Sequence, residues 1–543
     1  MRNFKLFYLF FLAGLFASHI NSFAQAVPPV STSQPPTGDS LRIIDILGSR
    51  QLTILKVNDS TTLQILAGNV RLKQATTFFN CDSCVINNNT NTFEAWGNVH
   101  IKDSDTVNLY AGHLRYLINK KIAFMDRGVK LTDGKGTLTT PDLEYDLNTD
   151  IGIYKNGGKV INKKTVLTSN EGYYYAGLKD VYFKKNVELR DPAYFIKTDS
   201  LLYNTETQTT RFISETFIRD SSGRTIETKE GFYNIGTGKA EFGQRPIIRD
   251  GKTTIIANKI AFDDSAGTSQ AMGNVIIIDS VQGTTILAGE VFRDNKKDRT
   301  LATRKPLMII KQDDDSIFVT ADTLFTARLS DLYQNKDSIV KDTVKGTKVV
   351  SVATKDSTNR YFEAYRHVRI FADSMQAVSD SMFYSFRDST FRLYQDPVLW
   401  SKESQITGDT VLVFTKNKKA DRVKVFENSF LVNQLDPEVF NQIKSSRMDG
   451  FFKDGTLDSV RATGFAECIY YIQDEDSSYT GINESKCDII DIYFAEQQLE
   501  KVVFRSAVKG TIWPISQKDP REMRLKNFRW LESKRPKTKY ELY

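Results

Sequence analysis

The chain has 543 residues, of which 40% are hydrophobic and 11% aromatic, so it carries enough apolar side chains to form a packed core. Its 73 Lys and Arg against 66 Asp and Glu leave a net charge of +7, too small for a dedicated nucleic-acid-binding protein. Only His100, His113 and His367 lie beyond the first twenty residues, so histidine-based metal or Ser-His-Asp chemistry is poorly supplied. The composition points away from catalysis.

The N-terminus has the layout of a secretory signal peptide. Arg2 and Lys5 precede an apolar run over residues 6–17, and small residues at Ser22 and Ala24 suit cleavage after position 24. We expect residues 1–24 to be a signal peptide and the Pro-rich residues 25–40 to be a linker. The apolar run is too short to span a bilayer, and no cysteine stands at the cleavage point to carry a lipid anchor. The rest of the chain is therefore predicted to be exported and not membrane-spanning.

The chain repeats itself with a period near thirty residues. The tripeptide GNV recurs at 68–70, 97–99 and 273–275, and FEAWGNVHI at 93–101 resembles FEAYRHVRI at 362–370. Valines at the same phase, at 70, 99, 129, 160 and 187, are separated by 29, 30, 31 and 27 residues. A second marker, a leucine or glycine two residues before an aromatic residue, closes segments between the first ones, as at 114–116, 143–145 and 201–203. Two markers in each unit predict at least two strands in each unit.

Within each unit the apolar residues alternate with polar ones. Phe93, Ala95, Val99 and Ile101 share one face, and β-branched and aromatic residues dominate throughout. Strict alternation is typical of strands with one buried face. We therefore predict an all-β protein, an elongated, solenoid-like stack of antiparallel strands with a repeat of about thirty residues.

The repeat also divides the chain. It fills residues 41–330 and 360–514, and the polar insertion between them, 331–359, is predicted to be a loop or hinge. Residues 515–543 are rich in Lys and Arg and are predicted to form a basic C-terminal tail.

Aligned units place a continuous apolar column on the inner face. This column is either the dry core of a closed solenoid or a trough for acyl chains, and periodicity does not separate the two. The candidate groove residues are Val70, Leu72, Phe93, Ala95, Val99, Ile101, Met125, Val129, Leu131, Phe183, Val187, Leu189, Val275, Ile277, Phe362, Ala364, Val368 and Ile370.

The ordered set of motifs resembles a known family. LxGNV at 66–70 is followed by FxAxGNVxI at 93–101, VxLTD at 129–133 and LTTxxLxYD at 138–146. In this order the chain is similar to the OstA-like, or LptA, family, whose members include the periplasmic lipopolysaccharide-transport protein LptA and the N-terminal domain of LptD. The resemblance is strongest over residues 41–240 and leaves the basic tail uncovered. It implies a V-shaped β-jellyroll whose interior holds lipid A acyl chains.

The function implied by this resemblance is a periplasmic scaffold, without catalysis or cofactor, that shields the acyl chains of lipopolysaccharide during transport to the outer membrane. It also implies docking with like-folded Lpt-type proteins through strand edges, and association with the outer membrane. Two alternatives stay open from the residues alone. The first is an exported structural or adhesive β-solenoid with a closed core and no lipid ligand. The second, a polysaccharide-processing β-helix enzyme, is disfavoured because no paired acidic site recurs.

The remaining reactive side chains do not form a recognisable catalytic or metal site. Cys81 and Cys84 lie among predicted strands and not at a helix N-terminus, where a redox thiolate is stabilised. Cys468 and Cys487 have no nearby histidine to complete a zinc site. We expect structural cysteines, with Cys81–Cys84 and Cys468–Cys487 as the candidate disulfides among three possible pairings. No metal site is expected, because the acidic run at 313–315 lacks the other ligands of a calcium loop.

Overall fold

The structure is a computed structural model that describes residues 44–542, apart from 104–106, 312–315, 334–358, 417–418, 454–455, 475, 477 and 496–497. The predicted signal peptide, the predicted linker, the acidic run and most of the polar insertion lie outside these residues.

Forty strands account for nearly all of the described chain, as the all-β prediction required. Before the insertion they are β1 (Asp45–Gly48), β2 (Gln51–Asn58), β3 (Thr61–Gln74), β4 (Thr77–Asn87), β5 (Thr92–Asp103), β6 (Val107–Leu117), β7 (Ile122–Thr132), β8 (Thr137–Asp146), β9 (Ile151–Tyr154), β10 (Gly158–Asn162), β11 (Thr165–Ser169), β12 (Glu171–Tyr175), β13 (Asp180–Arg190), β14 (Tyr194–Asn204), β15 (Thr209–Phe212), β16 (Thr216–Asp220), β17 (Thr225–Thr228), β18 (Glu230–Asn234), β19 (Lys239–Gly243), β20 (Ile247–Asp250), β21 (Thr253–Ile256), β22 (Lys259–Asp263), β23 (Thr268–Asp279), β24 (Thr284–Asp294), β25 (Arg299–Thr303), β26 (Leu307–Lys311), β27 (Ser316–Thr320) and β28 (Thr323–Arg328).

A one-turn helix, α1 (Ser330–Tyr333), opens the insertion. After it come β29 (Arg360–Ala372), β30 (Met375–Ser385), β31 (Thr390–Tyr394), β32 (Val398–Ser401), β33 (Ser404–Thr407), β34 (Thr410–Lys416), β35 (Lys419–Asp436), β36 (Val439–Lys453), β37 (Thr456–Gln473), β38 (Tyr479–Ala495), β39 (Gln498–Arg505) and β40 (Lys509–Pro514), then the short 3-10 turns Ile515–Gln517, Glu532–Lys534 and Lys539–Leu542.

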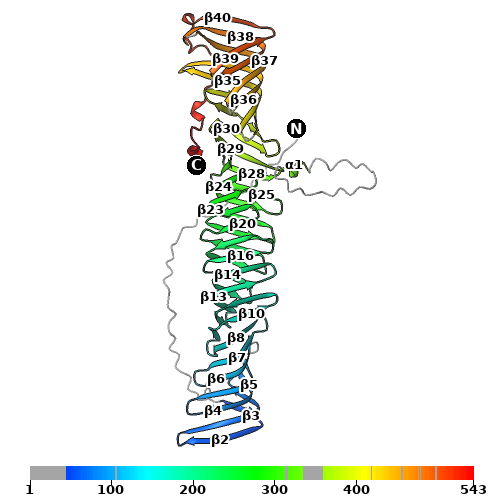
Figure 1. The fold of residues 1–543 in the computed structure, drawn as a ribbon, viewed down its shortest axis with the longest axis vertical. Coiled ribbons are helices and arrows are strands. Elements are labelled where there is room, and N and C mark those ends of the chain that lie inside the picture. Colours follow the sequence, from blue (N-terminus) through cyan, green and yellow to red (C-terminus); the bar gives the residue numbers. More distant parts are fainter. Residues whose placement is uncertain are drawn as a thin grey trace, which may run out of the picture.

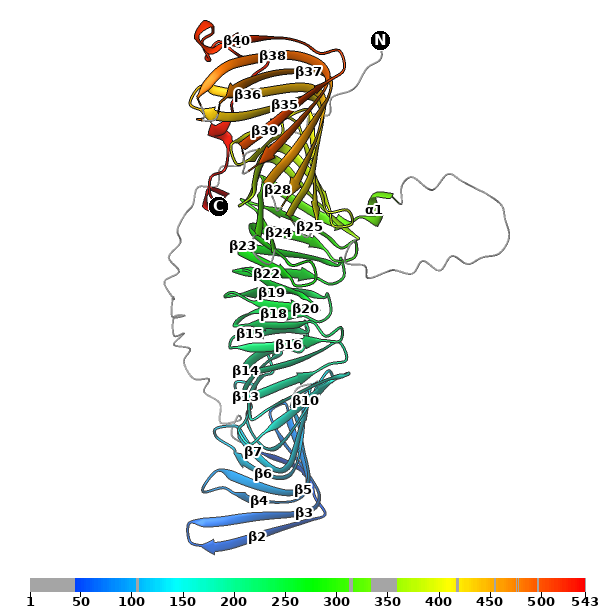
Figure 2. The same cartoon turned by 45° about the horizontal axis from the view of Figure 1, so that its top comes forward.

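The strands form one antiparallel sheet folded lengthwise into two walls. Figures 1 and 2 show a column in which the elements follow each other in chain order, from β2 at one end to β40 at the other. Each long strand crosses from the first wall to the second: in β5, residues 92–96 pair with 113–117, and residues 99–103 pair with 107–111 after a break in register. The fold is thus an elongated, repetitive β-jellyroll, as predicted.

The GNV motif marks the corner between the two walls. Gly97 and Asn98 both have positive φ, 75° and 44°, which is the left-handed region that glycine and asparagine tolerate best. Two residues in this region turn the strand sharply without ending its ladder, as a β-bulge does. The second corner residue, with positive φ throughout, recurs at Asn69, Asn98, Gly128, Gly157, Asn186, Arg245, Asn274, Lys305, His367, Asp396, Asn428, Phe465 and Ala507.

Proline follows the corner where one strand ends and the next begins. Pro246, Pro306 and Pro397 stand directly before β20, β26 and β32, positions where the missing N–H costs no ladder hydrogen bond. Proline therefore stands one residue after the corner position that Asn occupies in other repeats.

The structure corrects the predicted hinge. Strands β28 and β29, on either side of the insertion, pair from Thr323 with Tyr365 to Arg328 with Arg360, and β27 also pairs with β29. The sheet therefore continues across the insertion, and the two repeat regions are one stack. The length and polarity of the insertion do not predict how the strands on either side of it pair.

The basic C-terminal segment is packed against the column and is not a free tail. Met523 and Leu525 are buried against the outer face of the second wall beside β36 and β37, and Leu542 is buried against Leu307 and Phe371. We call residues 519–542 the strap. Its few apolar side chains, spaced among Lys and Arg, fill an outer face that the repeat leaves apolar at Phe430, Phe440 and similar positions.

Candidate functional site

The eighteen predicted groove residues all lie on the inner face of the two walls. Every one of them is buried, and the most exposed, Ile277, shows only 8% of its surface. They belong to one apolar cluster that runs from Leu66 to Ile492. These positions form the packed core, and along them the walls leave no open trough in this structure.

The two walls interlock through large side chains. Phe79 from the second wall lies edge-on to Phe93 of the first wall, with ring centroids 5.3 Å apart, and 4.9 Å from Tyr116. Contacts of this kind bury the rings and add directional attraction. The interior is therefore continuous and apolar, and it is filled by the protein's own side chains where the structure is narrowest.

A row of tyrosines closes the mouth, the side of the column opposite the corners. Tyr116, Tyr145, Tyr174, Tyr203 and Tyr233 stand 29 or 30 residues apart on the first wall, near the strand ends. We call this row, with the polar residues that face it from the second wall, the seam.

Three of these tyrosines form hydrogen bonds across the mouth. The Tyr116 hydroxyl donates to Gln74 Oε1 at 2.5 Å, and the Tyr174 hydroxyl donates to Asp133 Oδ2 at 3.0 Å. Asn162 Nδ2 donates to the Tyr203 hydroxyl at 3.4 Å. Each pair is separated by 41 or 42 residues, which is one and a half repeats, so each bond joins opposite walls.

The seam tyrosines stay protonated at neutral pH. Burial raises the pKa of Tyr116 and of Tyr174, and for Tyr174 the nearby Asp133 carboxylate adds to the effect. Burial and Asp264 raise the pKa of Tyr233 to about 12. A protonated phenol is a hydrogen-bond donor, which is what the facing carboxylate and amide oxygens need.

The seam is interrupted one repeat after Tyr233. The next position of the row is Phe262, which has no hydroxyl, and the guanidinium of Arg224 lies 5.0 Å from its ring centroid. Arg224 Nε lies 2.9 Å from Asp220 Oδ2, and Arg224 Nη2 lies 3.6 Å from Asp264 Oδ1 on the other wall. Here an ion pair replaces the tyrosine hydrogen bond.

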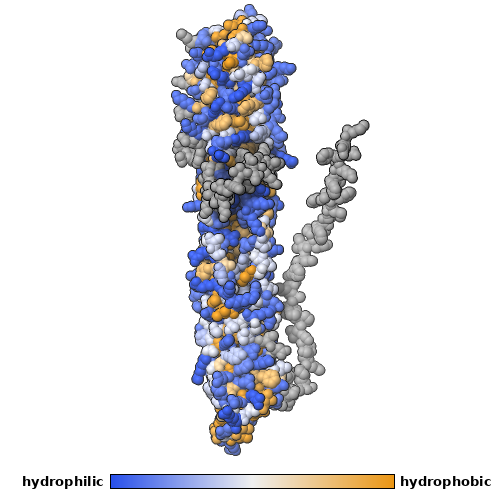
Figure 3. Space-filling model, turned by 90° about the vertical axis from the view of Figure 1, so that its right-hand side faces the viewer, coloured by the Kyte–Doolittle hydropathy of each residue, from blue (hydrophilic) through white to orange (hydrophobic). Residues whose placement is uncertain are grey.

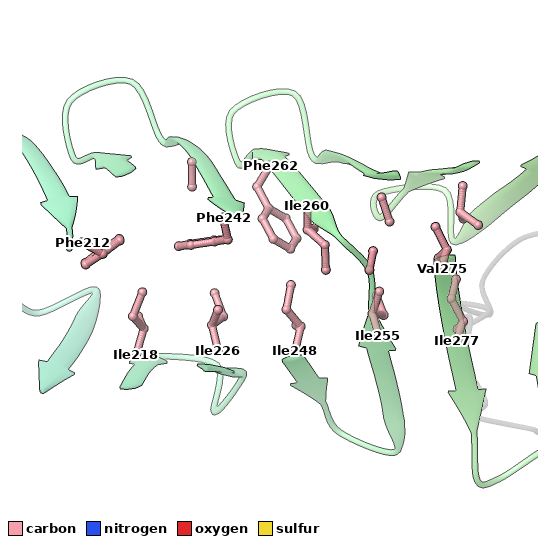
Figure 4. Close-up of a cluster of buried hydrophobic side chains, with 14 of the residues drawn as sticks. Phe212, Ile218, Ile226, Phe242, Ile248, Ile255, Ile260, Phe262, Val275 and Ile277 are labelled. Carbon is pink, nitrogen blue, oxygen red and sulfur yellow. The ribbon is translucent and has the colours of Figure 1, made fainter. Parts of the chain in front are cut away.

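A cavity of about 280 Å³ opens at this interruption. Figure 4 shows the buried side chains of the two walls in this part of the column, with Phe212, Phe242 and Phe262 on the first wall facing Ile218, Ile226 and Ile248 on the second. Its lining includes Ile196, Ile218, Ile226, Phe242 and Phe262, with Asp220, Arg224 and Asp264 at the rim. The interior core is accessible from the side here.

Two other hollows have several charged residues in their linings. One of about 220 Å³ lies further along the mouth, where Arg293 and Arg360 are both ion-paired with Asp298 beside apolar residues such as Ile277 and Met308. Another, of about 600 Å³, lies on the corner side and includes Lys197, Asp199, Glu215 and Lys229. Charged linings of this kind do not favour hydrocarbon.

The four cysteines are thiols in this structure, so neither predicted disulfide is formed. Cys81 and Cys84 sit in one strand on either side of its corner, and their side chains are hydrogen-bonded to each other. Cys468 lies opposite Ser485, and Cys487 lies opposite Ala466, so these two are diagonal neighbours across the ladder. All four are buried, and burial raises the pKa of the Cys487 thiol, which suits a structural role.

Within the described residues, each histidine side chain contacts a carboxylate or an amide side chain. His113 Nδ1 lies 3.0 Å from Asp126 Oδ2, and His367 Nδ1 lies 3.0 Å from Asp322 Oδ2. No group of three His, Cys, Asp or Glu in the described part of the chain could hold a metal ion. Among the same residues, no helix is long and apolar enough to cross a membrane.

Comparison with known proteins finds a family match for the first repeats. Residues 43–199 match the family described as OstA-like protein. We call this part of the chain, which is similar to that family, the OstA-like segment. The OstA-like segment runs from β1 into β14 and includes the tyrosine seam as far as Tyr174, and the same corner and strand pattern continues beyond it to β40.

A solved structure of LptH, described as the LptA homologous periplasmic component of the lipopolysaccharide transport device from Pseudomonas aeruginosa, is 11% identical to this chain. The match covers 26% of this chain and 82% of that chain with a TM-score of 0.19, so it supports no argument about how the strands are arranged here. No curated protein matches the chain.

Sequence reasoning identified the inner face and missed the seam. The leucine-x-tyrosine marker was visible at 114–116, 143–145 and 201–203, and the Asp that ends VxLTD was visible at 133. Their partnership across the mouth was not, because it depends on the offset of one and a half repeats between facing walls.

Proposed function

We propose that this protein is an exported, non-catalytic scaffold that binds lipid and shields the acyl chains of lipopolysaccharide on the way to the outer membrane. The observation that supports the proposal most is the single apolar cluster that runs from Leu66 to Ile492 behind a polar seam. Its location would be the periplasm, reached through the predicted signal peptide at residues 1–24.

The physical reason is the cost of exposing hydrocarbon to water. Each methylene left in water costs about 0.8 kcal/mol, so a lipid with several long acyl chains needs an apolar path across an aqueous compartment. Hydrophobic contact is non-directional, so a chain can exchange contacts from one repeat to the next at little cost. The walls are closed in this structure, and lipid binding therefore requires the seam to open.

The same burial supports a second candidate, an exported structural β-solenoid with a dry core. The eighteen inner-face residues are as buried as those of any closed core. The two candidates differ in whether the interior meets lipid.

Photo-crosslinking separates them. We would place p-benzoylphenylalanine at the inner-face positions Phe93 and Phe362 and, as a matched control, at Phe124, which is 38% exposed on the outer face. The lipid scaffold predicts lipopolysaccharide adducts at the inner positions and few at Phe124. A folded chain with no adducts at either inner position would favour the closed solenoid.

The N-terminal end is suited to a like-folded partner. Among the described residues, strand β2 pairs with β3 alone, and Ile54 is 67% exposed on it. Figure 3 shows apolar residues gathered at this end of the column. An unpaired edge of this kind accepts a further strand, so we propose that an Lpt-type protein docks here and continues the stack.

The docking is tested by charge. Ile54→Lys places an ammonium on the edge and is expected to weaken capture of such a partner, while Lys56→Arg on the same strand keeps its charge and serves as the control. Equal capture by both variants would contradict docking at β2.

A further inference from the structure

The seam and the cavity coincide at one place on the mouth. Counting 41 or 42 residues back from Tyr116, Tyr174 and Tyr203 gives the hydrogen-bond partner of each on the second wall, and counting 42 back from Phe262 gives Asp220. Phe262 has no hydroxyl to offer Asp220, so this carboxylate is paired with Arg224 instead. The cavity of about 280 Å³, lined by Ile and Phe side chains beneath its rim, lies at this position.

The cavity is sized for one chain and not for a whole lipid. Its volume of about 280 Å³ is just below the usual range of ligand pockets, about 300–1,000 Å³. Beneath the rim it is lined by Ile and Phe side chains and joins the continuous core. The neighbouring mouth hollow has the charged residues Arg293, Asp298 and Arg360 in its lining beside Ile277, Ile286, Met308 and Phe386, so it offers hydrocarbon a less uniform surface.

We propose that this cavity is the side port through which a single acyl chain of a lipid enters the interior, and that Arg224 is its latch. This inference rests on the proposed lipid-binding function. The seam on the side of Tyr203 holds the walls together by buried hydrogen bonds, and the port is where that closure is replaced by an ion pair.

The Arg224 side chain is placed so that it can move out of the mouth. Its side chain is 19% exposed and reaches across the mouth to Asp264, which is 41% exposed, so the guanidinium can turn out to solvent. The groups that face it are Asp220, Asp264, Tyr233 and the ring of Phe262. A partly exposed ion pair is weaker than a buried hydrogen-bonded contact and breaks at lower cost.

The test uses a neutral probe, a hexadecyl maltoside with a diazirine on its alkyl chain, and the purified full chain. After illumination, peptide mapping locates the label. In the unaltered chain the label is expected first on residues 193–264, and not on the charged hollow beside Arg293.

Three variants test whether Arg224 controls entry into the cavity. Arg224→Ala removes the latch and is expected to raise the rate of labelling roughly two- to fivefold, the size expected for loss of a partly exposed ion pair. Phe262→Tyr supplies the missing hydroxyl opposite Asp220 and is expected to lower the rate. Arg249→Ala is the control. It removes an outer-face ion pair with Glu227 of β17, 2.6 Å away, and is expected to leave the labelling rate unchanged.

The outcomes distinguish the port from the proposed function. Label at another part of the interior, or equal labelling rates in Arg224→Ala, Phe262→Tyr and the unaltered chain, overturns the port and leaves lipid binding standing. No interior label in a chain that melts normally by circular dichroism overturns the proposed function itself.

Discussion

Single corner residues set the shape of every repeat. At Gly97 the backbone φ is 75°, and a Cβ there would lie 2.3 Å from Asp82 Oδ2 on the neighbouring strand. Asn98, the next residue, donates from Nδ2 to the same Asp82 oxygen at 2.8 Å. Glycine is required both for the left-handed backbone and for the close approach.

Gly97→Ala is therefore expected to lower the free energy of unfolding by about 1–2 kcal/mol, the cost of an L-residue in the left-handed region. Gly177→Ala is the matched control, because its Cβ would meet no atom within 4 Å and its φ is not in that region. Urea denaturation followed by circular dichroism measures both. Equal midpoints for the two variants would contradict the role of the corner.

The buried seam tyrosines predict a loss of stability in alkali. Their pKa is raised in the folded chain, to about 12 for Tyr233, while an unfolded tyrosine releases its proton near pH 10. Above that pH the folded state binds more protons than the unfolded one, so the free energy of unfolding falls as the pH rises.

The midpoint of thermal unfolding should therefore drop as the pH rises from about 10 to about 12. Tyr174→Phe, which removes one raised pKa, should make the drop shallower. A midpoint that is constant over this interval would show that the seam does not titrate with folding.

At the scale of elements, the strap is held by glutamines that pair with its backbone. Gln442 Nε2 donates to Met523 O at 2.8 Å, and Gln442 Oε1 accepts from Leu525 N at 2.9 Å. Gln405 repeats the arrangement with Arg529 O and Leu531 N. Each amide thus imitates a neighbouring strand, because its carbonyl and NH₂ groups match the donor and acceptor of an extended chain.

Gln442→Ala leaves a buried N–H and C=O without these partners, which costs about 1–3 kcal/mol of local stability. Residues 519–542 should then exchange amide hydrogens faster, as measured by mass spectrometry. Gln51→Ala, on the exposed strand β2, is the control. Unchanged exchange in the strap would mean that its apolar contacts alone hold it.

At the scale of the whole molecule, the column is a rod because every repeat adds to one axis. Forty strands arranged as about 28 layers, at about 4.8 Å per layer, give a length on the order of 130 Å. The strap runs back along this rod from β36 to β26 and β29, so it ties the repeats on both sides of the insertion together.

Small-angle scattering from the purified chain should show a rod with a maximum dimension on the order of 130 Å. A compact protein of 543 residues would have a radius of gyration of only about 24 Å. A value near that figure would contradict the stacked arrangement.

Most of the local structure was predictable from the residues. The period-two alternation assigned Phe93, Val99 and Phe362 to the inner face, and all three are buried there. The repeat of about thirty residues predicted one stack, because units of equal length that bury the same face can only pack against each other. These features depend on neighbours along the chain, which the sequence displays directly.

The closure of the interior was decided by tertiary structure. The offset between the two walls decides that Phe79 contacts Phe93 and that the Tyr174 hydroxyl reaches Asp133. The outer face that remains apolar decides where the strap packs and that Leu525 bonds to Gln442. The offset between the walls arises when the corners fold the sheet on itself and bring residues 41 or 42 positions apart into contact. The alternation in the sequence predicts which side chains face inward, whereas the folded sheet determines which side chains they contact there.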